Sequence, residues 1–378
     1  MSKKICIGIL GGGQLAKMSA QAAAQLGLEV AILDKEQLSP AALLTQHAYV
    51  GWVDDIKLLK SFAQRCDVIT LENEFVDHHR IETLEQLGKK VCPSSTTIAL
   101  IQDKLLQKEA LTQQHIPVPR FIAVEKGNSF HEIASVVGKP FVLKSRKMGY
   151  DGYGNALIRN EKEYIENIAR LTSRHSNLIA ESFIRFSMEL AVMVARTKNE
   201  LAVYPVVQTI QKNHICHTVI APARIPHRVK REAEEIAVES VKAVHGYGLF
   251  GIELFLDENN NIIVNEMAPR PHNSGHYTIE ACITSQFENH IRAVLNLPLG
   301  STDMIAKSAV MINLLGKHHP QEPMEVYRTA MRHPNVHLHI YGKSASRVGR
   351  KMGHLTIVGN DVKKILREAV AVEKKIRL

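Results

Sequence analysis

Hydrophobic and polar positions near the start of the chain predict strands and helices in regular alternation. Apolar runs at residues 5–10, 29–33 and 67–71 fit buried strands, and residues 14–26 and 81–87 fit helices. Strands that alternate with helices form a parallel βαβ layer, because a helix must carry the chain back before the next strand begins. The pattern therefore predicts an N-terminal parallel-sheet domain of the Rossmann-like kind.

The pattern changes after Pro93-Ser94-Ser95, whose composition is typical of a boundary. A helical stretch at residues 97–114 leads into mixed strands and helices, and residues 230–244 predict an amphipathic helix. After Pro298-Leu299-Gly300, short strands follow without the earlier alternation. These shifts predict an α/β and α+β chain in three parts: residues 1–95, residues 96–298 with an inner lid subdomain at about 120–185, and a small β-rich C-terminal domain at 299–378.

Two lone carboxylates lie on neighbouring apolar segments of the middle part. Residues 250–256 and 262–265 predict two strands joined by a polar turn, and a hairpin would bring Glu253 and Glu266 side by side on one face. Mg²⁺ takes oxygen ligands and usually shares them with nucleotide phosphates. The pair therefore indicates half of a phosphoryl-transfer site. The structural alternative is two solvent-facing glutamates at the ends of edge strands.

The segment that follows Glu266 is dense in polar groups. Residues 268–276, APRPHNSGH, hold a guanidinium, two imidazoles, an amide and a hydroxyl. A surface loop does not need so many donors to anions, which favours a functional site. Together with the two glutamates, this segment resembles the C-terminal half of the ATP-grasp site of the N5-carboxyaminoimidazole ribonucleotide synthetase family. The resemblance extends from Gly11 to His354 and implies an ATP-grasp fold.

Composition narrows the class of protein. A chain of 378 residues is too long for one ordinary hydrophobic core. A content of 45% hydrophobic and 22% charged residues is typical of a soluble globular protein. No apolar run approaches the roughly 20 residues of a membrane span, and no signal peptide precedes the first strand, so we expect a cytoplasmic enzyme without membrane contact. Five scattered cysteines without a CxxC pair argue against disulfides and structural zinc.

A formal net charge of +9 would suit a nucleic-acid partner. The basic residues are spread along the chain, however, and aromatic residues make up only 5% of it, so neither a basic stripe nor a stacking platform is apparent. We therefore predict no nucleic-acid partner, and an anionic small substrate explains the excess charge equally well.

Gly11-Gly12-Gly13 follows the first strand and precedes a helix, and Asp34 ends the next strand. This arrangement resembles a dinucleotide fingerprint and favours an NAD-dependent oxidoreductase as one interpretation. The alternative, which we prefer, is a Rossmann-like turn that binds no dinucleotide. The backbone N–H groups of such a turn can hold the phosphoribosyl part of a substrate.

An apolar strand at residues 140–144 ends on Lys144, and the loop at 145–155 has glycines at positions 149, 152 and 154. A glycine loop after a strand-borne lysine is typical of a phosphate lid, because glycine lets main-chain N–H groups approach phosphates closely. Lys144 would neutralise the charge that builds up during transfer. A β-hairpin with a solvated lysine is the alternative.

The resemblance implies ATP as co-substrate and Mg²⁺ as the metal. It implies that Lys104 contacts the nucleotide, that Glu181 accepts the adenine amino group, and that Glu189 binds the ribose hydroxyls. The implied metal ligands are Glu253 and Glu266. The implied nucleotide contacts are Lys104, Lys144, Gly149, Tyr150, Gly152, Gly154, Asn155, Glu181, Ser182, Phe183, Ile184, Glu189, Gln211, His214, Asn265 and Glu266.

The resemblance also implies how the acceptor is held. Asp151 would orient or deprotonate the attacking amine, and three residues would hold bicarbonate and then carboxyphosphate, namely Arg270, His272 and Asn273. A cationic cluster at residues 341–354 would bind a 5′-phosphate, with a solvated basic loop as the alternative. The implied contacts of the acceptor nucleotide are Gln14, Glu74, Tyr150, Ser274, Lys343, Arg350 and Lys351.

The chain departs from the family pattern in three places. The sequence QTIQ stands where the family commonly has Glu-Asn-x-His, so the contact of that histidine falls to Gln211 or His214. The lid carries Met148, Tyr153 and Asn155 where glycine, lysine and glutamine are frequent. The first glycine turn has alanine at its last position.

The expected activity is the ATP-dependent carboxylation of 5-aminoimidazole ribonucleotide by bicarbonate in de novo purine biosynthesis, and the resemblance implies a homodimer. The alternatives are a formate-dependent ATP-grasp transformylase of the same pathway, an NAD-dependent oxidoreductase, and a non-catalytic nucleotide-binding regulator. An assay with formate in place of bicarbonate distinguishes the transformylase from the expected carboxylase. A change in reduced-nicotinamide absorbance would indicate the oxidoreductase, and ADP production would exclude the non-catalytic regulator.

Overall fold

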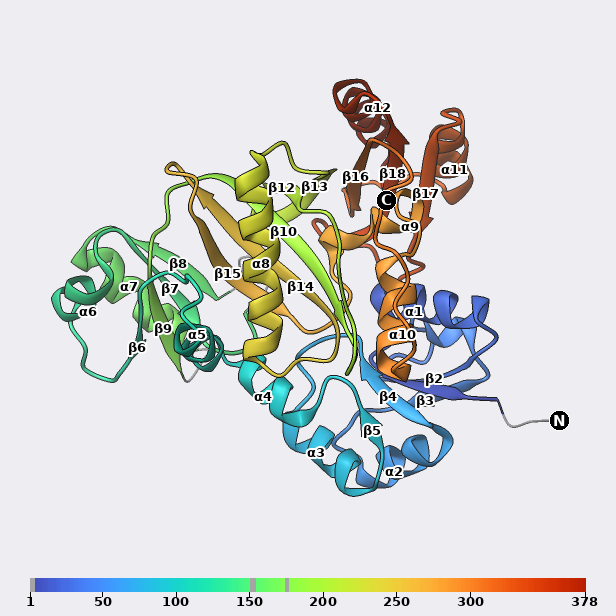
Figure 1. The fold of residues 1–378 in the computed structure, drawn as a ribbon, viewed down its shortest axis with the longest axis horizontal. Helices are drawn as coiled ribbons and strands as arrows, with labels where there is room; N and C mark the ends of the chain where they lie inside the picture. The colour runs from blue at the N-terminus through green and yellow to red at the C-terminus, as the bar shows by residue number, and fades with distance from the viewer. Residues whose placement is uncertain (1–3, 150–153, 174–176) are drawn as a thin grey trace.

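A computed structural model describes residues 4–149, 154–173 and 177–378 of the chain. Its strands form an N-terminal parallel sheet, a small antiparallel sheet, and a large antiparallel sheet at the centre (Figure 1). Over these described ranges, no helix is both long enough and apolar enough to cross a membrane.

The N-terminal sheet is the predicted parallel layer, with the strand order β3-β2-β1-β4-β5. Every residue of β1 is buried, as expected for a parallel strand with both faces covered. The elements of this domain are β1 (Cys6–Leu10), α1 (Gln14–Gln25), β2 (Glu29–Asp34), η1 (Ala42–Leu44), β3 (His47–Val50), α2 (Ile56–Arg65), β4 (Val68–Leu71), α3 (His78–Gln86) and β5 (Lys90–Val91).

The glycine turn before α1 is filled by side chains of the protein itself. The Gly12 N–H donates to Asp34 Oδ2 at 2.6 Å, and the Leu15 N–H donates to Glu72 Oε1 at 3.4 Å. A Cβ atom on Gly13 would lie 2.1 Å from Glu72 Oε1, so glycine is needed for this carboxylate to reach the start of the helix. A carboxylate therefore occupies the position where dinucleotide-binding folds hold a pyrophosphate, which argues against the NAD interpretation.

The helical stretch predicted at residues 97–114 is two helices, α4 (Ser95–Gln102) and α5 (Lys104–Gln113). Asp103 separates them in an extended conformation, and its carboxylate accepts the Leu105 N–H at 3.0 Å to cap α5. Arg146 holds the same carboxylate at 2.6 Å. The sequence predicted one helix because a long-range ion pair, and not a local breaker such as proline, stabilises the interruption.

The small antiparallel sheet forms the predicted lid subdomain at the left of Figure 1, with the strand order β6-β9-β7-β8. Its core is formed by apolar side chains of both helices and of the strands. The elements are β6 (Phe121–Val124), α6 (Phe130–Val137), β7 (Phe141–Ser145), β8 (Asn155–Ile158), α7 (Glu161–Thr172) and β9 (Leu178–Ser182).

The central sheet has the order β15-β14-β10-β12-β13-β16-β18-β17, with β11 beside β10. Helix α8 lies across β10, β14 and β15 (Figure 1) and buries Val229, Ala233, Ala237 and Val241, which are spaced four residues apart. The elements are β10 (Phe186–Arg196), β11 (Leu201–Val203), β12 (Val207–Lys212), β13 (Ile215–Ala221), α8 (His227–Ala243), β14 (Gly248–Asp257), β15 (Ile262–Ala268), η2 (Asn273–Gly275), α9 (Thr278–Ala281) and α10 (Gln286–Leu295).

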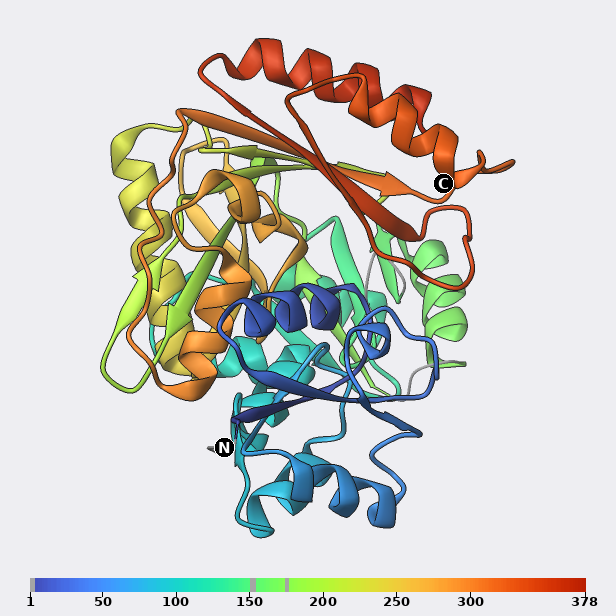
Figure 2. The ribbon, with the colours of Figure 1, turned by 90° about the vertical axis from the view of Figure 1, so that its right-hand side faces the viewer.

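The C-terminal strands form the predicted β-rich C-terminal part, and they also pair with the central sheet. Strand β16 pairs antiparallel with β13, placing Val310 opposite Ile220, and β18 and β17 follow. Pairing to β13 removes what would otherwise be an exposed sheet edge. The two C-terminal helices lie together at the top of Figure 2. The elements are β16 (Ser308–Leu315), α11 (Pro323–Met331), β17 (Val336–Ile340), β18 (Lys351–Gly359) and α12 (Val362–Lys375).

Candidate active site

A cleft of about 1420 Å³ is lined by residues of the central sheet, the lid subdomain and both ends of the chain. The predicted site residues that line it are Gln14, Glu74, Lys104, Lys144, Gly149, Asn155, Glu181, Ser182, Phe183, Ile184, Glu189, Gln211, His214, Glu253, Asn265, Glu266, Arg270, His272, Asn273, Lys343, Arg350 and Lys351. Gly154 and Ser274 do not line it. The other three predicted residues lie outside the described ranges: Tyr150, Asp151 and Gly152.

The two carboxylates lie side by side in the cleft, which confirms the predicted hairpin. Glu253 of β14 is directly opposite Glu266 of β15, and the register shifts at a bulge after Glu253. Residues directly opposite in an antiparallel pair place their side chains on the same face. The two side chains keep 28% and 40% of their surface exposed, so their oxygens are accessible from the cleft.

The electrostatic environment separates the two glutamates. Burial, together with the negative charges of Glu266 and Glu189, raises the pKa of the Glu253 carboxyl to about 8. Burial also acts to raise the pKa of Glu266, but the Lys104 ammonium, with which Glu266 forms a short ion pair, outweighs it and lowers that pKa to about 2. At neutral pH the pair therefore keeps one proton, which a divalent cation can displace.

Two lysines share one buried carboxylate beside this pair. Lys144 Nζ lies 2.9 Å from Glu181 Oε2, and Lys108 Nζ lies 3.4 Å from Glu181 Oε1. Burial acts to raise the pKa of Glu181, but the two lysines outweigh it and lower the pKa, so Glu181 is ionised. Its expected contact with adenine stays a prediction. Sequence reasoning missed Lys108, although it follows Lys104 by one helical turn.

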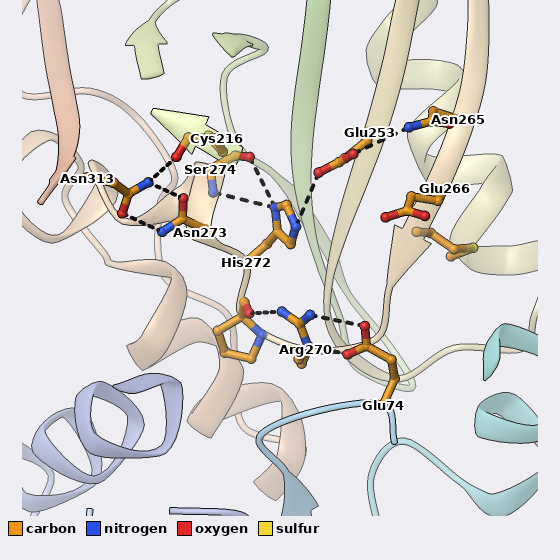
Figure 3. A network of polar contacts seen from close by, with 12 residues as sticks. Glu74, Cys216, Glu253, Asn265, Glu266, Arg270, His272, Asn273, Ser274 and Asn313 are labelled. Atoms are coloured by element: carbon orange, nitrogen blue, oxygen red, sulfur yellow. Dashed lines mark hydrogen bonds and ion pairs between the residues drawn. The ribbon is translucent and has the colours of Figure 1, made fainter. Parts of the chain in front are cut away.

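Arg270 and Glu74 form a two-point ion pair at one side of the cleft (Figure 3). The Nε–Oε2 distance is 2.5 Å and the Nη2–Oε1 distance is 3.1 Å. Burial acts to raise the pKa of Glu74, but Arg270 outweighs it and lowers the pKa. Glu74 follows β4 and Arg270 follows β15, so the pair connects the N-terminal domain with the central sheet. A planar guanidinium suits an oxyanion with two oxygens, and such a ligand would compete with Glu74.

His272 points toward the carboxylate pair (Figure 3). Its Nε2 atom lies 3.5 Å from Glu253 Oε1, and its Nδ1 atom lies 3.1 Å from Ser274 Oγ. Burial, followed by the charges of Arg270 and Lys351, lowers the pKa of His272 to about 3, so the imidazole is neutral. Ser274 was expected to contact the acceptor, but its side chain is buried behind the cleft surface and contacts His272 instead.

The amide of Asn273 is engaged within the protein (Figure 3). It donates to Asn313 Oδ1 at 2.9 Å and accepts from Asn313 Nδ2 at 2.5 Å. Asn313 also donates to the Cys216 carbonyl at 2.8 Å. Asn273 thus ties the loop after β15 to β13 and β16, and its expected contact with bicarbonate stays a prediction.

The lid loop is a hairpin between β7 and β8 that places Lys144 opposite Asn155. The Ser145 N–H donates to the Gly154 carbonyl at 2.8 Å, and Gly154 has a φ of 85°, which favours glycine. Lys144 is only 13% exposed and lines the cleft, so the alternative of a solvated lysine is wrong.

The residues that the resemblance assigns to adenine and ribose also line the cleft. Ser182 ends β9, and Phe183 and Ile184 follow it into the lining. Burial raises the pKa of Glu189 on β10, and a hydrogen bond with Gln211 acts in the opposite direction. Gln211 therefore contacts the predicted ribose-binding carboxylate, and both positions suggested for the missing histidine, Gln211 and His214, line the cleft.

The cationic cluster lies between β17 and β18. Lys343, Arg347, Arg350 and Lys351 all line the cleft, and the role of this cluster as a 5′-phosphate site stays a prediction. Arg350 Nη1 donates to the Ala345 carbonyl at 2.8 Å, which holds the loop in shape.

Comparisons with family profiles cover most of the chain. The ribonucleotide synthetase preATP-grasp domain matches residues 3–102, the ATP-grasp domain matches residues 109–287, and the phosphoribosylaminoimidazole carboxylase C-terminal domain matches residues 309–368. The order of these three regions is the order of the predicted parts.

Several characterised proteins are similar to the whole chain. A phosphoribosylaminoimidazole carboxylase of Vigna aconitifolia is 40% identical over 96% of this chain and 65% of its own length, so the chain spans less than two thirds of that relative. A crystal structure of N5-carboxyaminoimidazole synthase from Aspergillus clavatus, in complex with ADP and 5-aminoimidazole ribonucleotide, aligns with a TM-score of 0.91 and 35% identity over 100% of both chains. An N5-carboxyaminoimidazole ribonucleotide synthase of Synechococcus elongatus is 42% identical over 93% of this chain and 89% of its own length. With that identity and coverage, the chain belongs to the N5-carboxyaminoimidazole ribonucleotide synthase family of ATP-grasp ligases.

Proposed function

We propose that the protein carboxylates the exocyclic amine of 5-aminoimidazole ribonucleotide with bicarbonate and ATP. The products are N5-carboxyaminoimidazole ribonucleotide, ADP and phosphate, and the step belongs to de novo purine biosynthesis. The observation that carries the proposal is the single cleft in which the carboxylate pair Glu253 and Glu266 faces lysines on one side and Arg270 on the other. The ligands of the Aspergillus relative, ADP and 5-aminoimidazole ribonucleotide, support it.

The nucleotide is proposed to lie between the lid subdomain and the central sheet. The backbone after β9 would hold the adenine edge, Glu189 the ribose hydroxyls, and Lys104 and Lys144 the phosphates. Each lysine forms an ion pair with a carboxylate, Lys104 with Glu266 and Lys144 with Glu181. A phosphate group would compete with these carboxylates for the lysines, whose positive charge is needed during phosphoryl transfer.

The paired carboxylates fit Mg²⁺. Glu253 and Glu266 supply hard oxygen ligands on one face, and the Asn265 amide lies 3.5 Å from Glu253 Oε2. These two glutamates would hold the ion, which when bound draws electron density from the terminal phosphate oxygens. Burial, followed by the charge of Glu266, raises the pKa of Glu253, and a bound cation would favour the ionised form of this carboxyl.

Carboxyphosphate is proposed to form beside Arg270 and His272. A bicarbonate oxygen attacks the γ-phosphorus, and the bond from this phosphorus to the β–γ bridging oxygen breaks. The amine of the acceptor then attacks the carboxyl carbon, phosphate leaves, and the amine proton passes to a base. Asp151 is the proposed base, and Arg270 would hold two oxygens of the intermediate. Water must be excluded while the intermediate exists, which is the proposed role of the glycine lid.

ADP release is expected only when 5-aminoimidazole ribonucleotide, bicarbonate, ATP and Mg²⁺ are all present. A coupled ADP assay with each component omitted in turn measures this, and formate in place of bicarbonate is expected to support no turnover. Equal rates with formate would favour the transformylase alternative, and ADP release without the acceptor would argue against the proposed carboxylation.

Mg²⁺ binding in the presence of a non-hydrolysable ATP analogue is expected to release a proton at neutral pH. Burial and the charge of Glu266 raise the pKa of Glu253 to about 8, so this carboxyl is protonated below that pH, and the metal needs the ionised form. Affinity should rise by up to about tenfold per pH unit below pH 8 and level off above it. Calorimetry in buffers of different ionisation enthalpy measures the proton, and Glu253→Gln should abolish its release. An affinity independent of pH between about 6 and 8 would contradict this assignment.

We also propose that the enzyme is a cytoplasmic homodimer, as the resemblance implies. Light scattering of the purified chain measures the assembly directly.

A further inference from the structure

Lys108 is a buried cation for which the proposed function has no role. It is 2% exposed, and it does not line the cleft. Its Nζ atom donates to the Asn265 carbonyl at 3.1 Å and lies 3.4 Å from Glu181 Oε1. Burial of an unpaired ammonium costs free energy, so the position of Lys108 beside Glu181 needs a structural or functional explanation.

Glu181 is held from two sides by cations in different positions. Lys144 approaches Oε2 at 2.9 Å from the cleft, and Lys108 approaches Oε1 from beneath the surface. Only one of these lysines can leave for a ligand in the cleft, because Lys108 is not part of the lining. If Lys144 moved to a phosphate and Glu181 had no other cation, a carboxylate that is 2% exposed would stay uncompensated.

The backbone around Lys108 is fixed to the central sheet. The neighbouring Gln107 accepts the Met267 N–H at 3.2 Å and donates to the Met267 carbonyl at 3.3 Å. The Gln107 side chain of helix α5 therefore bonds both backbone polar groups of Met267 in β15. Lys104, one turn earlier on the same helix, is engaged by Glu266. Of the two lysines that contact Glu181, only Lys144 lines the cleft and can move to a ligand there.

We propose that Lys108 is a positioning residue that remains with Glu181 as its counterion when a nucleotide binds, and thereby releases Lys144 to the phosphates. The inference rests on the proposed function, because it requires a phosphate-bearing nucleotide in the cleft. Lys108 touches no substrate in this scheme. It acts by lowering the cost of separating Lys144 from Glu181.

The test is nucleotide binding by the full chain, measured by calorimetry with Mg²⁺ and a non-hydrolysable ATP analogue. Lys108→Met is expected to weaken binding by about tenfold or more. Lys144 is then the one remaining cation paired with Glu181, and its movement to a phosphate would leave a buried carboxylate without a counterion. Adenosine, which has no phosphate, should bind both proteins alike. Lys108→Arg keeps the charge and should recover most of the affinity. Lys17→Met is the control, because Lys17 also donates to backbone carbonyls, those of Ile340 and Tyr341, outside the cleft.

A double-variant cycle keeps the inference testable if Lys108→Met alone does not fold. Glu181→Gln removes the charge that Lys108 is proposed to balance, so adding Lys108→Met to it should change analogue binding by less than about threefold. A larger further loss, an unchanged affinity of the single variant, or an equal loss for adenosine would overturn the role of Lys108. Failure of the unaltered protein to bind the analogue would instead contradict the proposed function.

Discussion

Replacing Glu266 by glutamine is expected to reduce kcat by about 10³-fold, because a metal ion contributes several kcal/mol to phosphoryl transfer and each 1.4 kcal/mol corresponds to a factor of ten. The substitution keeps the size of the side chain and removes one of two facing carboxylates. It also frees Lys104 from its ion pair. Lys104 alone cannot substitute for a divalent cation, since it offers no bridge between two phosphates. The coupled ADP assay at saturating substrates measures the loss.

The matched control is Glu258→Gln, which removes the same charge from the turn of the same hairpin, where Glu258 is exposed to solvent and outside the cleft. Its kcat should stay within about twofold of the unaltered protein, as expected for a surface substitution. Analogue binding of the Glu266→Gln protein should lose its dependence on Mg²⁺. Retained turnover, or a binding curve that still responds to Mg²⁺, would remove Glu266 from the metal site.

The central pair could be predicted from sequence because its geometry is local. Residues 250–256 and 262–265 are two apolar runs around a short polar turn, and the length of the turn sets the register of such a hairpin. One residue of slip would have turned Glu266 to the other face. The bulge after Glu253 was not predicted, since nothing in the local composition distinguishes it.

The contacts that hold the site residues in place could not be predicted in the same way, because they join distant parts of the chain. Asn313 reaches Asn273 because β16 pairs with β13 of the central sheet, and the sequence did not indicate this pairing. The family resemblance implied that Ser274 contacts the acceptor. Its burial depends on tertiary packing around η2, which periodicity does not report.

The ion pairs in the cleft could not be predicted from the sequence either. Lys104 and Lys144 were singled out as phosphate contacts, yet the sequence does not tell which carboxylate each one pairs with. Glu74 and Arg270 lie 196 positions apart and still form the two-point pair. The cleft therefore holds its functional cations on protein carboxylates, and a nucleotide or an oxyanion must compete with these partners to bind.

Arg270→Met is expected to lower kcat by about 10²- to 10³-fold with little change in analogue binding, because Arg270 is proposed to hold bicarbonate and then carboxyphosphate, and not the nucleotide. The guanidinium pairs with Glu74, whereas the two lysines pair with Glu266 and Glu181. Arg270→Lys keeps the charge but loses the planar two-point geometry, so it should recover only a small part of the rate. Steady-state kinetics with each substrate varied in turn separate kcat from the KM for ATP.

Loss of an Arg–Glu pair can also damage the fold, and Arg292→Met measures that effect. Arg292 pairs with Glu288 on α10 at 2.5 Å with similar exposure, but it does not line the cleft. Its kcat should be unchanged, while both methionine variants lose stability to a comparable extent in thermal unfolding. A raised KM for ATP with normal kcat in Arg270→Met would place this residue on the nucleotide instead. A normal rate would show that Glu74 and Arg270 serve only to join the two domains.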